Sequence, residues 1–214
     1  MLPEGFILRM QSLLGEEYAA FSASFDRPLC TGLRLNPLKT GFTGDLSRFS
    51  LSPVPWCPTG YVYDAASRPG LSSYHAAGLY YLQEPSAMAP AELLDPQPGE
   101  RVLDLCAAPG GKTLLLAEEM QNTGTLYSCD AAENRVQLIR TAVERMGFTN
   151  VKTLCNDATQ TNPALPQADR ILADVPCSGL GILAKKPDLR YKKLEPAREA
   201  ELLAPQSAIL DTAA

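Results

Sequence analysis

The stretch with the clearest chemical meaning is residues 102–113, where a short apolar run ends in an acid and a turn of small residues leads into a leucine-rich segment. Val102, Leu103 and Leu105 predict a buried strand, and residues 113–120 predict the helix that follows. Glycine and alanine in the turn at 107–111 would let backbone N–H groups approach a ligand closely, because no large side chain stands in the way. The stretch therefore predicts a ligand-binding turn.

Several interpretations of this turn compete. Gly111, Lys112 and Thr113 match the end of the phosphate-binding pattern GxxxxGK[ST], but Cys106 occupies the position of its first glycine, which disfavours a nucleoside triphosphate. The dinucleotide pattern GxGxxG is absent. A nucleoside cofactor without a large phosphate group, such as S-adenosylmethionine, fits better, since Asp130 ends the next expected strand, where a carboxylate can accept hydrogen bonds from ribose hydroxyls. A tight turn that binds nothing is the remaining alternative.

The elements around the turn alternate between strand and helix. We expect strands at 101–106, 125–129, 151–155 and 169–175, and helices at 113–121 and 133–146. The second helix has an apolar stripe and ends at Gly147. Such alternation predicts an α/β fold with a parallel sheet covered on both faces. Ligands on these sheets bind beyond the carboxyl ends of the strands, and four acids are expected at that edge: Asp104, Asp130, Asp157 and Asp174.

A thiol is expected at the same edge. Cys177 lies on a turn bounded by Pro176 and Gly179, shortly after Asp174. A thiolate can add to C6 of cytosine and make C5 nucleophilic enough to attack a methyl donor, on a base unstacked from RNA. Four other cysteines are interpreted as small buried apolar residues: Cys30, Cys57, Cys129 and Cys155. The only histidine, His75, is interpreted as an ordinary polar contact.

The composition limits the class of protein. The 214 residues contain no apolar run long enough for a membrane span and no secretory signal, so we expect a cytoplasmic protein. The six cysteines form no CxxC pair, and we expect no metal site. A net charge of −5 argues against a generally basic nucleic-acid binder. The segment 185–198 nevertheless collects six basic residues as a candidate phosphate contact: Lys185, Lys186, Arg190, Lys192, Lys193 and Arg198.

The first part of the chain predicts a small accessory domain over 1–73, ahead of a second domain over 74–214. We expect a helix over 2–24 with Phe6, Met10, Leu13 and Leu14 on one face, broken at Gly15, and a strand at 33–37 stopped by Pro37. Prolines predict a stiff connector at 50–58. A helix should begin at His75 and break at Pro85, where polar residues either line a pocket or simply connect two domains.

Four motifs carry a resemblance to a known family: LRLNP (33–37), YLQEPSAM (81–88), DLCAAPGGKT (104–113) and ADVPCSG (173–179). Together they resemble the RNA 5-methylcytosine methyltransferases of the Nop2/Sun family, especially the bacterial branch that modifies 16S ribosomal RNA. The resemblance implies a Rossmann-like methyltransferase domain behind a small α+β accessory domain of RNA-binding type, with ribosomal RNA as partner, no metal, and a monomeric state.

The resemblance also implies roles for individual residues. Asp130 would hold the ribose of S-adenosylmethionine, Asp157 would lie near its adenine, and Asp174 near its methionine end and the target base. Cys177 would be an auxiliary thiol that assists product release. The residues that would wrap the cofactor are Cys106, Ala107, Ala108, Pro109, Gly110, Gly111 and Lys112.

One family feature is missing from the sequence. The attacking thiol of the family belongs to a Thr-Cys pair one strand further on, and these 214 residues contain no such pair. We therefore expect a fragment with four of seven strands, able to bind cofactor but not to methylate. The alternatives are a transfer RNA enzyme, a DNA cytosine-5 enzyme with a Pro-Cys nucleophile, and a non-catalytic RNA-binding module that uses the segment 185–198.

Overall fold

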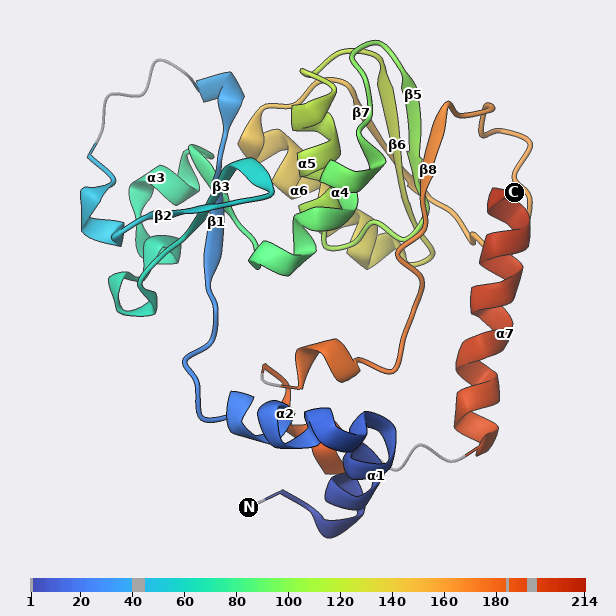
Figure 1. Ribbon diagram of the computed structural model, residues 1–214. Coiled ribbons are helices and arrows are strands. Elements are labelled where there is room, and N and C mark those ends of the chain that lie inside the picture. The colour runs from blue at the N-terminus through green and yellow to red at the C-terminus, as the bar shows by residue number, and fades with distance from the viewer. Residues whose placement is uncertain (1, 40–44, 184, 192–195) are drawn as a thin grey trace. The chain divides into compact units, whose positions relative to one another are not determined.

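The computed structural model describes residues 2–39, 45–183, 185–191 and 196–214, with side chains for all of these except 196–199 (Figure 1). The chain forms two compact units. One comprises Met1–Leu29 with Pro176–Ala204, and the other Cys30–Val175 with Pro205–Ala214. These units are defined by packing alone, so the functional domains at 1–73 and 74–214 stay a prediction.

The first unit contains α1 (Glu4–Leu14), α2 (Tyr18–Ser24) and two 3₁₀ turns, Leu180–Ile182 and Pro187–Tyr191. Phe6 and Met10 are buried and pack with Leu183. The expected break at Gly15 is confirmed, since α1 ends there. The placement of Leu13 on the buried face is wrong, because the buried stripe follows the i, i+4 pair Phe6 and Met10 and leaves Leu13 65% exposed. The long helix α7 (Pro196–Ala213) begins in this unit.

An antiparallel sheet opens the second unit. Its strands are β1 (Gly32–Leu35), β2 (Ser52–Val54), β3 (Cys57–Val62) and β4 (Tyr80–Leu82), in the order β2-β3-β1-β4. The stop of β1 before Pro37 is confirmed. The stiff connector at 50–58 is wrong, because β2 and β3 form a hairpin there; Pro53 is tolerated since β2 lies at the sheet edge. The helix at His75 is only the short α3 (Ser73–Ala76), and β4 was not expected.

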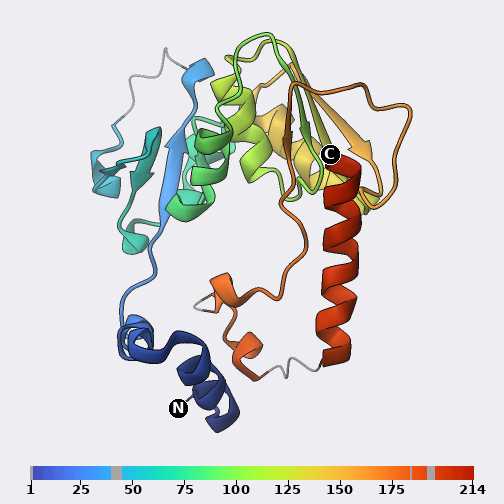
Figure 2. The same cartoon turned by 45° about the vertical axis from the view of Figure 1, so that its right-hand side comes forward.

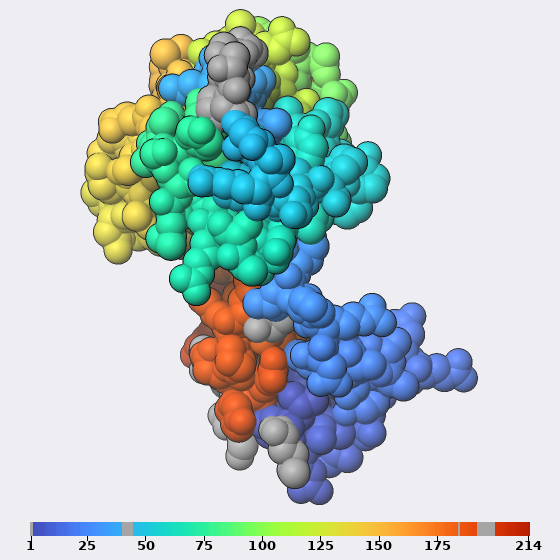
Figure 3. Space-filling view, turned by 90° about the vertical axis from the view of Figure 1, so that its left-hand side faces the viewer, coloured from blue at the N-terminus to red at the C-terminus, as the bar shows by residue number. Residues whose placement is uncertain are grey.

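Residues that flank the antiparallel sheet, Asn36 after β1 and His75 in α3, contact the end of α6 (Glu133–Met146). The Nδ2 group of Asn36 donates to the carbonyls of Gly78 and Met146, both at 2.8 Å. Arg145 Nη1 donates to the carbonyl of His75 at 2.7 Å. In Figure 3 the yellow surface of α6 accordingly lies beside the teal and green surface that follows β3.

The second sheet is parallel throughout and contains β5 (Arg101–Asp104), β6 (Thr125–Asp130), β7 (Val151–Cys155) and β8 (Arg170–Leu172), in the order β7-β6-β5-β8. Helices α4 (Ala89–Leu94), α5 (Gly111–Glu119) and α6 pack on one face, while Ile209 of α7 packs on the other (Figure 2). A strand is confirmed at each of the four predicted places, although β8 is much shorter than the predicted 169–175, and both predicted helices are confirmed. The predicted stripe of α6 is buried: Val136, Ile139, Val143 and Met146.

This arrangement is a Rossmann-like α/β fold. Within the residues that the structure describes, no helix combines the length and the apolar character needed to cross a bilayer. The same residues include no group of three or more His, Cys, Asp or Glu side chains placed to hold a metal ion.

Candidate functional site

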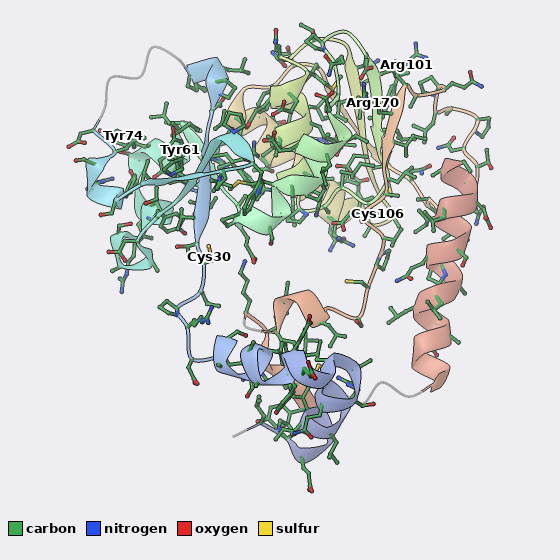
Figure 4. The ribbon with its side chains drawn as sticks, viewed as in Figure 1. Cys30, Tyr61, Tyr74, Arg101, Cys106 and Arg170 are labelled. Carbon is green, nitrogen blue, oxygen red and sulfur yellow. The ribbon has the colours of Figure 1, made fainter. Side chains whose placement is uncertain are left out.

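The four acids predicted at one edge of the parallel sheet do lie there. Asp104 and Asp130 are the last residues of β5 and β6, Asp157 follows β7, and Asp174 follows β8. Figure 4 shows Cys106 at this edge, and Arg101 and Arg170 at the opposite end of the strands. The carboxyl ends of four neighbouring strands thus surround the turn between β5 and α5, as expected for a ligand site on such a sheet.

Backbone hydrogen bonds hold this turn against the neighbouring strands. The N–H of Leu105 donates to the carbonyl of Leu172 at 3.0 Å, and the N–H of Ala107 donates to that of Cys129 at 2.8 Å. Gly110 precedes α5 with φ +104°, a conformation that glycine adopts without strain. The first N–H groups of α5 therefore start at Gly111, on the side where the acids gather.

Asp130 holds the turn in addition to its predicted place near a ribose. Its Oδ2 accepts from the N–H of Ala108 at 3.3 Å and lies 3.3 Å from Arg135 Nη2. Arg135 in turn donates to the carbonyl of Ala108 at 3.2 Å. Asp130 is almost fully buried, yet a carboxylate has acceptor capacity for a ligand hydroxyl besides these contacts.

Asp104 ends β5 but lies beneath the turn rather than on its surface. Its side chain is fully buried, and Oδ2 accepts from Thr113 Oγ1 at 2.8 Å, with Ser128 Oγ 2.8 Å from the same hydroxyl. The other oxygen, Oδ1, has no hydrogen-bond partner among the described residues. Burial raises the pKa of Asp104 to about 7, so near neutral pH a large fraction carries a proton.

The outer acids offer charge to a ligand. The side chain of Asp174 is 52% exposed and forms an ion pair with Lys112 at 2.6 Å. A carboxylate and an ammonium group therefore lie next to each other beside the turn. Asp157 accepts from the N–H and hydroxyl of Thr159 at 3.0 and 2.7 Å, which lowers its pKa and keeps it ionised. Carboxylates, an ammonium and helix N–H groups match a ligand with ribose hydroxyls and an amino-acid group.

Cys106 lines this site as a thiol. Burial, and then the negative charges of Asp104, Asp130 and Asp174, raise its pKa to about 11, which disfavours a nucleophilic thiolate. Cys57 and Cys129 are buried as predicted. Cys30 and Cys155 are exposed, so their interpretation as buried residues is wrong: Cys30 precedes β1, and Cys155 ends β7 at the edge of its sheet.

Cys177 and the basic segment belong to the first unit. Cys177 is exposed, and its catalytic role stays a prediction. The guanidinium of Arg190 lies 4.4 Å from the centre of the Phe25 ring and donates to the carbonyl of Leu183 at 3.3 Å, so it is engaged within the unit. Lys192, Lys193 and the side chain of Arg198 lie outside the described residues. Phosphate binding by this segment therefore also stays a prediction.

The only histidine, His75, makes an ordinary contact, as expected. The ring of His75 packs against Tyr80 with centroids 5.8 Å apart, and burial, followed by the charge of Arg145, lowers its pKa. It is therefore mostly neutral at pH 7.

Residues of the antiparallel sheet form an unexpected wall behind the turn. A Cβ added to Gly111 would lie 3.3 Å from Tyr81 and 3.4 Å from the Gln83 amide, so these side chains pack directly on the glycine. Fully buried Arg34 forms an ion pair with Glu118, and its Nη2 lies 3.3 Å from the Gly111 carbonyl. Gln83 thus helps to support the turn, and the two predicted roles of the polar segment at 83–86 stay predictions.

The fold and the strand-end acids around the turn are those expected of the cofactor-binding domain of an S-adenosylmethionine-dependent methyltransferase. The profile described as "16S rRNA methyltransferase RsmB/F" matches residues 91–214, and the chain belongs to that family. The profile of the N-terminal domain of 16S rRNA methyltransferase RsmF matches residues 2–85.

Individual relatives agree with this assignment. Ribosomal RNA small subunit methyltransferase F of Enterobacter sp. (strain 638) is 35% identical over 99% of this chain and 47% of its own length. The crystal structure of PH0851 is similar with a TM-score of 0.88 and 32% identity, over 99% of this chain and 49% of that one. A methyltransferase homologue from Pyrococcus horikoshii has a TM-score of 0.76 at 28% identity, over 99% of this chain and 72% of its own. The chain spans about half the length of the curated relatives it matches.

Proposed function

We propose that the protein acts as an S-adenosylmethionine-dependent methyltransferase on small-subunit ribosomal RNA, and that this chain supplies the cofactor site. The observation that carries the proposal is the turn at 105–111, which backbone hydrogen bonds tie to the neighbouring strands and which lies among strand-end acids. Relatives that match almost all of this chain are named for methylation of ribosomal RNA.

The described side chains suggest how the cofactor would be held. Residues 106–112 would wrap it, with Asp130 at the ribose and Asp157 toward the adenine. Lys112 and Asp174, already paired at 2.6 Å, could receive the carboxylate and the ammonium of the methionine end. The bound cofactor would supply an electrophilic methyl group.

A finer proposal concerns the methylated atom. A thiolate that adds to C6 of cytosine would make C5 a nucleophile. C5 would take the methyl group as the bond from that group to the sulfonium sulfur breaks, which leaves a neutral thioether, and a base would then remove the C5 proton as the thiolate leaves. Resemblance assigns that thiol to a Thr-Cys pair absent from the 214 residues, and gives Cys177 an auxiliary part in product release. Cys106 is a poor candidate for the nucleophile because its pKa is about 11.

Cofactor binding is tested by titration calorimetry of the chain with S-adenosylmethionine. We expect binding by the unaltered chain and a loss of at least about tenfold in affinity for Gly110→Ala, since strain at φ +104° would shift the turn. Gly99→Ala is the matched control: φ is +89°, nothing lies within 4 Å of the added Cβ, and Gly99 precedes the opposite end of β5. Equal affinities of the two variants would contradict this site, and absence of binding would contradict the function.

Methyl transfer is tested separately with radiolabelled S-adenosylmethionine and small-subunit ribosomal RNA. We expect no transfer by the 214-residue chain alone, because it lacks the Thr-Cys pair. Substitution of Cys177 by Ser should leave cofactor affinity unchanged within about twofold. Robust transfer by the 214 residues would disprove the assigned place of the nucleophile, and transfer to transfer RNA instead would correct the substrate.

A further inference from the structure

Arg34 is a fully buried cation whose contacts all lie within the second unit. It projects from β1 between Leu33 and Leu35, onto the sheet face that packs against α5. Nε donates to Gln83 Oε1 at 2.7 Å, Nη1 pairs with Glu118, and Nη2 donates to the Gly111 carbonyl at 3.3 Å. The guanidinium thus contacts both ends of α5, since Gly111 begins this helix and Glu118 lies in its last turn.

The partners of Arg34 are themselves fixed. Gln83 Nε2 donates to the carbonyl of Ala87 at 2.8 Å, which orients its Oε1 toward Arg34. The Tyr81 ring lies 5.8 Å from the guanidinium carbon and packs on Gly111. Arg34 on β1 and Tyr81 on β4 therefore both contact Gly111, the first residue of α5.

A buried ion pair such as Arg34 and Glu118 contributes little net stability. Removal of two charges from water costs several kcal/mol, and apolar residues of similar volume often stabilise a protein equally well. Burial raises the pKa of Glu118 to about 7, and the positive charge of Arg34 opposes that rise. The guanidinium has a distinct geometric advantage: its planar fork can direct N–H groups to an acid and a carbonyl at once.

We propose that Arg34 is a positioning residue for the cofactor site. Arg34 fixes the start of α5 so that the first N–H groups of this helix, together with the turn before it, can bind the ligand. This proposal rests on the proposed function, because it deepens the account of the same site. Arg34 touches no expected ligand and acts through the Gly111 carbonyl.

Calorimetry with S-adenosylmethionine and hydrogen exchange without ligand test the proposal on the whole 214-residue chain. We expect Arg34→Met to weaken binding by about tenfold and to speed amide exchange at 114–118, whose N–H groups are hydrogen-bonded to the first residues of the helix. Arg34→Lys keeps the charge but not the fork, so it should remain folded and show the same two effects. Glu118→Gln leaves an acceptor for Arg34, and should keep affinity within about twofold.

Leu33→Ala is the matched control for general destabilisation. Leu33 is fully buried on the same strand, but in the cluster with Phe49 and Tyr80 on the other face. It should lower the melting temperature while affinity and exchange at 114–118 stay near those of the unaltered chain. Equal effects of Leu33→Ala and Arg34→Lys, or unchanged exchange in Arg34→Lys, would overturn the positioning role. If the unaltered chain binds no S-adenosylmethionine and the Arg34 variants still exchange faster at 114–118, the proposed function is refuted and Arg34 is a structural support only.

Discussion

Asp104 is an acid enclosed beneath the turn, and its surroundings link stability to pH. The pKa is about 7 in the folded chain, against 3.8 as the ordinary value. Between about pH 4 and 7 the folded chain therefore holds a proton that the unfolded chain has released. Stability from this group is present at low pH and falls as the pH rises through that window.

Asp104→Asn should remove the loss of stability that ionisation of the buried Asp104 causes at high pH. At pH 8 we expect a higher free energy of unfolding, by up to about 4 kcal/mol, and little difference at pH 4, because an amide does not ionise. Urea unfolding between pH 4 and 8 measures both. Asp157→Asn is the comparison variant, and its effect on stability should have the opposite sign. Because the pKa of Asp157 is lowered, loss of this carboxylate should reduce the free energy of unfolding only at the higher pH. An unchanged pH slope in Asp104→Asn would mean that Asp104 is ionised in the folded chain.

At the scale of residues, the sequence predicts the site where strand ends coincide with polar residues. Asp130, Asp157 and Asp174 follow from the rule for parallel sheets. Arg34 does not, because alternation along β1 places it on the face opposite Leu33, and the same pattern is typical of a solvent-facing position. Only the packing of α5 against that face buries it.

Among the elements, α6 shows most clearly how a local pattern determines packing. Its apolar stripe repeats at helical spacing and Gly147 ends it with φ +85°. Ile139 on this stripe lies directly behind the turn, since a Cβ on Gly110 would approach the Ile139 Cα to 3.4 Å. The helix thus supports the turn at 105–111 from behind.

Ile139→Ala should lower the free energy of unfolding by about 3 to 4 kcal/mol, because Ile139 is fully buried. Leu138→Ala is the control from the neighbouring position; Leu138 is 55% exposed and should change stability by less than about 1 kcal/mol. Urea denaturation of both variants gives the comparison. Similar losses in the two variants would contradict the buried stripe.

The antiparallel sheet was less predictable than α6, and for a physical reason. Its strands β2 and β4 have three residues each, too few for a period to stand out, and β2 contains a proline. Their strand conformation depends on pairing: β2 pairs with its hairpin partner β3, and β4 pairs with β1, which lies far away in the sequence.

For the molecule as a whole, the two units have separate cores. Phe6, Met10 and Leu183 form the buried centre of the first unit, and no residue of the parallel sheet belongs to that cluster. Damage to one core should therefore leave local stability in the other largely intact.

Phe6→Ala tests this independence. We expect faster amide exchange in peptides from 4–24 and 180–190, by hydrogen exchange with mass spectrometry, because truncation of a buried Phe costs about 3 to 5 kcal/mol. Peptides from 101–155 and the affinity for S-adenosylmethionine should stay unchanged. Leu13→Ala, at an exposed position of the same helix, should alter neither. Faster exchange throughout 101–155 would show that the units unfold together.

The strand order β7-β6-β5-β8 also affects the chain while it is being synthesised. β6 and β7 emerge in sequence and can each pair with the strand before them, but the other side of β5 receives its neighbour only when Arg170–Leu172 appears. Until then one side of β5 has unpaired backbone N–H and C=O groups, and its side chains include the apolar Val102 and Leu103. An exposed strand edge of this kind promotes aggregation. Nascent chains arrested between β7 and β8 should therefore depend most strongly on chaperones.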